Sequence, residues 1–238
     1  MSTNDQSSAA PAWLGLLLQV TDTAYPTGAF AHSGGLEGMM QLGQVRDLDG
    51  LARFLDRSVL LTLERCHLPL LRLSREAALD LDGATIARLD EIAGALCPPE
   101  ELRLASSRSG RQRLQLLAKV MHLDTVHPRE WEALVPRLRD AHLPVVAGIE
   151  AALLEIPEAP ALQAFAYGTV STILSASMKI MRIGQTPVQE LLSRMMTLVP
   201  GVVERSRGIN LGTLGAFTPV ADIASARHKR ADLRLFLS

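Results

Sequence analysis

Apolar positions recur with helical spacing along most of the chain. Between residues 51 and 63 they follow one helix face, formed by Leu51, Phe54, Leu55, Val59, Thr62 and Leu63. Leu60 and Leu61 fill the opposite side, so we expect this helix to be central. Pro69 is expected to kink or end it, because proline has no backbone N–H to donate.

The segment "IGQTPVQELLSRMMTLV" predicts two helices joined by a tight turn. Gly184 is expected to end the first helix in a left-handed conformation. Thr186 then caps the second helix, with Pro187 at its first position and Gln189 completing a capping box. The second helix has one apolar face, formed by Val188, Leu191, Leu192, Met195, Met196 and Val199.

No run of alternating apolar and polar residues predicts a strand. The expected fold is therefore all-α, a single-domain bundle of about eight to ten helices. Residues 1–12 are polar and are expected to be a disordered tail, followed by a short helix over Trp13–Val20 and a domain over 13–238. Residues 206–238 combine a glycine-rich connection with a mixed basic and apolar end, which predicts a mobile segment.

Composition excludes several classes of partner. The net charge is -1 and aromatic residues make up 4%, so nothing points to nucleic acid or an anionic membrane surface. The weakly polar stretch 161–178 is long enough to cross a bilayer, but its Ser, Thr and Gln residues favour a buried bundle helix. The two cysteines, Cys66 and Cys97, form no CxxC motif, which fits a reducing compartment and a cytoplasmic protein.

Catalytic and metal-binding patterns are lacking in the sequence. His32 and Ser33 are adjacent, but a nucleophile and its base must meet in space, and there is no GxSxG motif. The six histidines form no HxH or HxxxH pair, and no set of three or four zinc ligands is apparent. We therefore predict no catalytic residues, no metal site and no cofactor.

The stretch "TDTAYPTGAFAHSGGLEGMM", residues 21–40, differs from its helical surroundings. Pro26 and Gly28 predict a turn, and Ser33 can cap a helix that begins between Gly34 and Glu37. Phe30 is a large apolar group on this turn, and it fits either a plug for the core or a contact for a partner. Our hypothesis is a rigid elbow that presents Phe30, His32 and Ser33.

Three ordered blocks resemble the urease accessory protein UreF family. "LLLQVTDTAYPTGAFAHSGGLE" is similar to the family's N-terminal signature, through Pro26, Gly28, Phe30, Ser33, Gly35, Leu36 and Glu37. "MKIMRIGQTPVQELL" resembles its basic, Gly-Gln helix junction, with Lys179, Gly184, Gln185 and Gln189 in register. "TPVADIASARHKRADLRLF" resembles its C-terminal signature, through Thr218, Pro219, Ile223, Ala224, Ser225, Arg227, His228, Arg234, Leu235 and Phe236.

The chain also departs from the family pattern. Lys229 and Arg230 follow His228 where the family usually has Glu, and Leu237 stands where a basic residue is frequent. Arg182 replaces an apolar residue or proline of many members. Residues 45–140 match only in helical character.

The resemblance implies a homodimer that is not an enzyme and that acts in nickel insertion into apo-urease. It implies a bridge between the accessory protein UreD/UreH and the GTPase UreG, control of the GTP cycle, and a C-terminal segment that becomes ordered on UreD/UreH. The partner-binding residues carried over are Pro26, Gly28, Phe30, His32, Ser33, Glu37, Lys179, Gln185, Ser225, Arg227, His228, Arg234, Leu235 and Phe236.

The residues themselves leave two other functions open. One is a metallochaperone that carries nickel directly on His32, His228 or Cys66. The other is a small α-helical hydrolase that uses Ser33 with His32.

Overall fold

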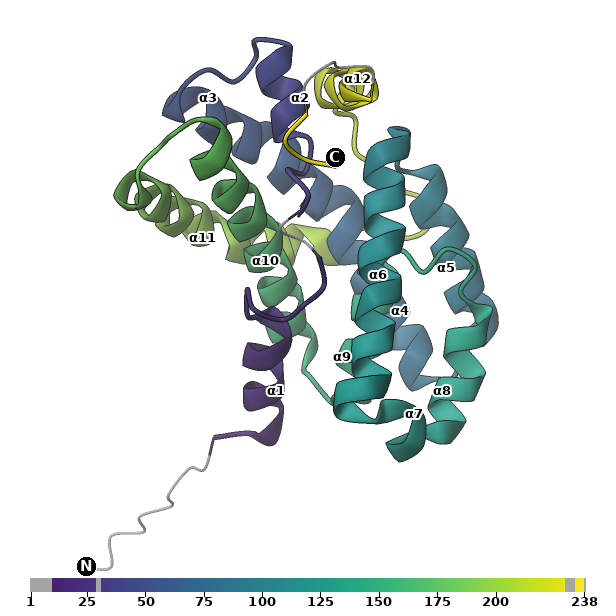
Figure 1. The fold of residues 1–238 in the computed structure, drawn as a ribbon. Coiled ribbons are helices and arrows are strands. Elements are labelled where there is room, and N and C mark those ends of the chain that lie inside the picture. Colours follow the sequence, from purple (N-terminus) through teal and green to yellow (C-terminus); the bar gives the residue numbers. More distant parts are fainter. Residues whose placement is uncertain (1–9, 29–30, 230–233, 238) are drawn as a thin grey trace, which may run out of the picture.

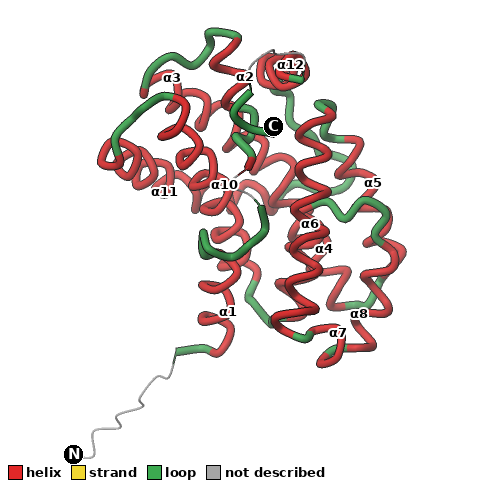
Figure 2. Tube along the Cα trace, viewed as in Figure 1, coloured by secondary structure: helices red, strands yellow, loops and turns green. Residues whose placement is uncertain are grey.

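The computed structural model describes residues 10–28, 31–229 and 234–237. Every regular element in these ranges is a helix and none is a strand, which confirms the all-α prediction (Figure 2). The short helix predicted over 13–20 is α1 (Ala12–Thr21). Residues 1–9, the greater part of the predicted disordered tail, and Phe30 lie outside the described residues.

A continuous helical segment over residues 48–79 passes through the centre of the molecule. It consists of α3 (Leu48–Phe54), the π-helical turns η2 (Leu55–Leu60) and η3 (Leu63–His67), and α4 (Leu68–Leu79). Pro69 lies in the first turn of α4, so the helix does not end there. The ring of a helical proline displaces the bond to the carbonyl four residues back. That carbonyl, on Arg65, instead accepts the Gly215 N–H at 3.1 Å.

Two helices cover this central segment closely. α9 (Leu143–Leu153) lies against α4, and a Cβ atom added to Gly148 would stand 2.4 Å from the Leu71 carbonyl oxygen. The lack of a side chain at Gly148 therefore allows the backbones of α9 and α4 to come this close. α5 (Gly83–Ala95) also packs on α4, and α6 (Glu100–Met121) packs on α9. The shorter helices at this end are α7 (Leu123–Val126), α8 (Pro128–Leu134) and η4 (Val135–Arg137).

The turn between α10 (Glu158–Ile180) and α11 (Gln185–Arg207) differs from the prediction. Gly184 has an extended backbone with φ −67°, and the left-handed residue is Arg182 with φ 53°. α11 begins at Gln185, two residues earlier than predicted, so Thr186 lies inside its first turn and no side chain caps it. The predicted left-handed glycine and capping box are therefore wrong. The apolar face is confirmed, because Val188, Leu191, Leu192, Met195 and Val199 are buried.

The glycine-rich connection after α11 is held by arginines of the central segment. Arg72 donates to the Ile209 carbonyl at 2.7 Å, and Arg65 donates to the carbonyls of Thr213 and Gly215. The connection leads to α12 (Pro219–His228), which packs on α2 (Leu36–Gln41) and α6. Figure 1 shows the C-terminal end beside α2 and α12, while α1 lies alongside α10 at the other end of the molecule.

None of the helices within the described residues is both long enough and apolar enough to cross a lipid bilayer.

Candidate functional site

The turn predicted within residues 21–40 is present where the structure describes it, but Ser33 is fully buried, so the prediction that the elbow presents Ser33 is wrong. Gly28 has φ 78°, and its carbonyl accepts the Ala31 N–H at 3.1 Å, which closes the turn after the exposed Pro26. Gly35 occupies the N-cap position of α2, and the Ser33 hydroxyl, two residues earlier, accepts the Glu37 N–H of the first turn at 3.2 Å. The elbow thereby fixes Glu37 in the first turn of α2, where its side chain is buried.

The Glu37 carboxylate receives the C-terminal end of the chain. Its Oε1 accepts the Leu235 N–H at 2.8 Å and its Oε2 accepts the Phe236 N–H at 3.0 Å. One residue further, the Leu237 N–H donates to the Ala31 carbonyl of the elbow at 2.9 Å. The N-terminal and C-terminal signature blocks therefore meet, although about 200 residues separate them in the sequence.

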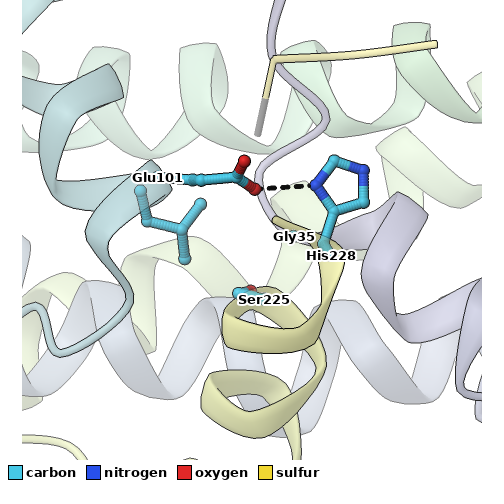
Figure 3. Close-up of a pocket in the computed structure, with 5 residues that line it drawn as sticks. Gly35, Glu101, Ser225 and His228 are labelled. Atoms are coloured by element: carbon cyan, nitrogen blue, oxygen red, sulfur yellow. Dashed lines mark hydrogen bonds and ion pairs between the residues drawn. The ribbon is translucent and has the colours of Figure 1, made fainter. Parts of the chain in front are cut away.

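A second carboxylate completes this arrangement. His228 lies between Glu37 and Glu101, and its Nε2 is 3.0 Å from Glu37 Oε2. Its Nδ1 is 2.8 Å from Glu101 Oε2, the contact that Figure 3 shows. Arg234 donates to the other Glu101 oxygen at 2.8 Å. We call this set the tail clasp, and it consists of Glu37, Glu101, His228, Arg234, Leu235 and Phe236. Lys229 adds an exposed ion pair to Glu100 at 2.6 Å.

Two glycines bring α12 against α2. A Cβ atom on Gly38 would lie 2.7 Å from the Ala224 carbonyl oxygen, and one on Gly35 would lie 2.9 Å from the Ser225 hydroxyl. Gly35 also has φ 86°, which glycine adopts at little cost. The "SGGLEG" sequence is therefore required for the close approach that buries Ser225 and His228.

Most of the residues predicted to bind a partner gather around the tail clasp. Lys179 of α10 places its ammonium 5.7 Å from the centre of the buried Phe236 ring, a cation–π contact. Ser33, Glu37, Ser225, His228, Arg234 and Leu235 lie in or beside the clasp. Gln185 and Arg227 are exposed, and their side chains make no contact with the clasp within the described residues. Phe30 lies outside them.

Nothing in the sequence marks Glu101 as a site residue. Glu101 stands 127 positions from His228, and no local pattern connects the two. Only the packing of α12 on α6 brings them together.

The clasp geometry does not suit a metal ion. The two nitrogens of the His228 ring point at different carboxylates on opposite sides, so the three groups do not converge on one point. No group of three His, Cys, Asp or Glu side chains within the described ranges could hold an ion. Burial raises the pKa of the Cys66 thiol, which disfavours the thiolate that binds soft metals.

His32 takes no part in the clasp contacts given above. Its ring is half-buried, and burial, together with the nearby Arg108 charge, lowers its pKa. Its neighbour Ser33 is fully buried, with its hydroxyl at the start of α2. A bulky substrate has no route to a buried hydroxyl, so this geometry gives the hydrolase alternative no support.

Exposed apolar side chains lie on α12 and just before it. Phe217 is 85% exposed and Ile223 is 54% exposed, and Val220 between them is also exposed. Val220 and Ile223 are three residues apart and share one side of α12 with the exposed Arg227, while Phe217 lies two residues before the helix begins. Leu235 and Leu237 add exposed apolar groups from the tail. We call Phe217, Val220, Ile223, Leu235 and Leu237 the outer apolar patch.

Comparison with known proteins gives a consistent result. The UreF family model matches residues 45–196. The chain is 32% identical to the urease accessory protein UreF of Azoarcus sp. (strain BH72) over 238 residues, which is 100% of both chains. It is 31% identical to that of Xanthobacter autotrophicus over 229 residues, which is 96% of this chain and 93% of the relative. It is 28% identical to that of Bradyrhizobium diazoefficiens over 100% of this chain and 97% of the relative.

Proposed function

We propose that this chain, which belongs to the urease accessory protein UreF family, is a non-enzymatic scaffold and regulator of nickel insertion into apo-urease. Its relatives are named as accessory proteins rather than as enzymes. In this proposal it holds UreD/UreH on one side and the GTPase UreG on the other, and the assembly docks on apo-urease. The nucleotide cycle of the GTPase then responds to whether the scaffold is complete.

The observation that carries the proposal is the outer apolar patch. Single exposed apolar residues are common on protein surfaces, but five on and around one short helix and the adjoining tail are typical of an interaction site. Large apolar groups such as Phe217 act as anchors when a partner covers them. We assign the patch to UreD/UreH, because the C-terminal signature that supplies it is the block for which the family resemblance implies that partner.

The test is capture of UreD/UreH by the full chain. Ile223→Asp places a charge in the patch at an exposed position of α12, and it leaves the buried Ala224, Ser225 and His228 unchanged. We expect capture to fall at least about tenfold, since burying an unpaired charge costs more than about 1.4 kcal/mol. Leu79→Asp is the matched control, because Leu79 is similarly exposed at 56% but ends α4, away from the patch. Equal capture by both variants and the unmodified chain would contradict the proposal.

A second surface suits the proposed homodimer. The ten residues of α1 carry no charge, and only Val20 among them is buried. Leu18 is 65% exposed, and α1 rests mainly on α10, whose residues 161–178 are also uncharged. A two-fold axis places a patch against its own copy, so a surface without charge meets no repulsion there. We therefore place the dimer contact at α1 and the neighbouring face of α10.

The carrier alternative has a direct test. A metallochaperone binds nickel in a fixed ratio at micromolar concentration when isolated, whereas the proposed scaffold does not. Equilibrium dialysis of the purified chain with nickel measures this difference.

We also expect the protein in the cytoplasm, where its unpaired Cys66 and Cys97 remain reduced.

A further inference from the structure

A groove of about 330 Å³ lies between the π-helical turns of the central segment and α11. One wall carries Asp56 and Leu60 of η2, Leu61, and Glu64 of η3. Residues spaced by about four positions share one side of a helix, so these side chains form a continuous wall. The volume is at the lower end of the range for ligand sites, about 300–1,000 Å³. The groove is therefore large enough to enclose a single side chain or a small ion.

Both walls of the groove contain an interruption of regular α-helix. η2 and η3 are π-helical turns, which are rare and are often found at functional sites. On the opposite wall, Pro200 lies inside α11 and has no N–H to donate. Gly201 follows it, and a Cβ atom added there would lie 3.2 Å from a guanidinium nitrogen of Arg205. Glycine at this position keeps the groove open, although it is a poor helix former.

The groove combines an apolar lining with charged groups. Leu60 and Val202 are buried, Leu61 is half-buried, and Leu198 is 41% exposed. Apolar side chains of this kind cover methylene groups well. Lysine and arginine have a stem of methylene groups and a charged head, so they lie along apolar surface while the head stays in water or meets an anion.

The charged groups of the groove are mainly anionic. Asp56 is exposed and has no partner among the described residues. Glu64 pairs with Arg205 at 2.8 Å, and the Thr197 hydroxyl already donates within α11. Two carboxylates thus face one guanidinium, which leaves a negative charge unbalanced. Arg57, the neighbour of Asp56 in the sequence, is not among the lining residues. The missing partner must therefore bring a positive charge and N–H donors, because a carboxylate only accepts hydrogen bonds.

We propose that this groove is a docking site for a lysine or arginine side chain of a partner protein, with the stem on Leu60 and Leu198 and the charged head at Asp56. Charge complementarity of this kind fixes the register of an interface. The inference goes beyond the proposed function, because no lining residue belongs to the outer apolar patch, the tail clasp or α1.

A free alkylammonium or alkylguanidinium ion has the same chemistry, but it is the weaker occupant. An exposed ion pair contributes little to binding, and a small ion loses its translational freedom when it binds. A side chain within a larger interface shares that loss with the other contacts of its protein. The groove is therefore assigned to a cation that a protein carries, with apolar neighbours that cover the exposed Leu198.

The test uses two peptide probes of the same shape. Acetyl-Leu-Arg-Leu-amide carries the cation between two apolar side chains, and acetyl-Leu-citrulline-Leu-amide replaces the guanidinium by an uncharged ureido group. Each is titrated to millimolar concentration into the full chain, and NMR follows the amides of Leu61, Leu198 and Gly201. The arginine peptide should bind about two- to fivefold more tightly, the range of an exposed ion pair. Equal binding of the two peptides, or no shift at these amides, would overturn the proposal.

A third probe, n-butylguanidinium, separates a free ion from a side chain carried by a protein. It has the cation and a stem but no flanking leucines, so it should bind more weakly than the arginine peptide. An affinity equal to or greater than that of the peptide would identify a free ion as the occupant and would overturn the assignment to a protein.

Two variants separate the Asp56 charge from surface charge in general. Asp56→Asn keeps the shape of the side chain and should abolish the preference for the arginine peptide over the citrulline peptide. Glu204→Gln is the matched control, because Glu204 is exposed on α11 but pairs with Arg207 and does not line the groove. It should keep the full preference. The same loss in both variants would contradict a specific role of Asp56.

Gly201→Leu tests the groove itself. The added side chain fills the space beside Arg205 and leaves both carboxylates in place, so binding of both peptides should be lost. Replacing a glycine inside a helix favours the helix, so the unfolding temperature should not fall. Peptide binding that survives in this variant would show that the peptides bind elsewhere, and it would overturn the proposal.

Discussion

At the scale of single residues, Glu37 has the largest number of roles in the site. Its N–H is bound by Ser33, and its carboxylate accepts two tail amides and contacts His228. The Glu of the signature is therefore placed to connect the elbow, α12 and the tail. The elbow itself depends on Gly28, whose φ of 78° is disfavoured for every residue with a Cβ atom.

Gly28→Val is expected to destabilise the folded chain by about 1–2 kcal/mol, because the left-handed backbone brings Cβ close to the following carbonyl. Urea unfolding of the purified variant gives the value. Gly168→Val is the control, since neither glycine has an atom within 4 Å of an added Cβ and Gly168 lies within helix α10. If the two variants lose the same stability, the backbone conformation at Gly28 is not the cause.

Residue-level prediction from the sequence succeeded where the signal was local. The turn at Gly28 and the hydrogen bond from the Glu37 N–H to Ser33 follow from chemistry within a few residues, and both are present. The prediction for the junction before α11 also used local signals, but it was wrong. Gly184 and Thr186 have strong local preferences, but the chain places its left-handed residue at Arg182 and starts the helix earlier. Glu101 carries no local signal at all, because its role comes from packing.

At the scale of elements, close approaches of helix backbones determine the arrangement. α9 approaches α4 at Gly148, and α2 approaches α12 at Gly38. Apolar periodicity predicted an all-helical bundle, but it does not indicate which helices pair. A glycine inside a helix gives a weak indication of pairing, because it costs helix stability and so implies a steric reason.

Gly148→Ala should destabilise the protein by about 1–3 kcal/mol, as is typical of an overpacked core. The added methyl group would meet the Leu71 carbonyl at 2.4 Å and the Ser74 Cβ at 2.7 Å, and backbone cannot move aside cheaply. Thermal unfolding measures the effect. Gly168→Ala, which adds the same group to open space on α10, should be neutral or stabilising by up to about 1 kcal/mol. A neutral Gly148→Ala would show that α4 and α9 can separate.

At the scale of the whole molecule, the two surfaces proposed for binding UreD/UreH and for the dimer lie at different ends. The outer apolar patch lies at the end that holds α2 and α12, and the uncharged helix α1 lies at the other (Figure 1). The sequence predicted a bundle with an interacting tail, but it gave no indication that the tail folds back onto the elbow. Such contacts span nearly the full chain, and periodicity reports only on neighbours within a few turns.

Leu18→Glu should convert the proposed homodimer to a monomer, because the symmetric contact would bring two like charges together in an apolar surface. Light scattering coupled to size exclusion measures the mass. Leu79→Glu places the same change at a similarly exposed leucine outside the α1 surface and should leave the dimer intact. A dimer that persists in Leu18→Glu, or one lost equally in both variants, would place the contact elsewhere.

The central claim is that this chain works by holding other proteins together. It is tested most directly by purifying the full chain together with UreD/UreH and UreG and measuring the mass of what elutes. The account predicts one complex that contains all three proteins and two copies of this chain. Elution of this chain apart from both partners, at any protein ratio, would contradict it.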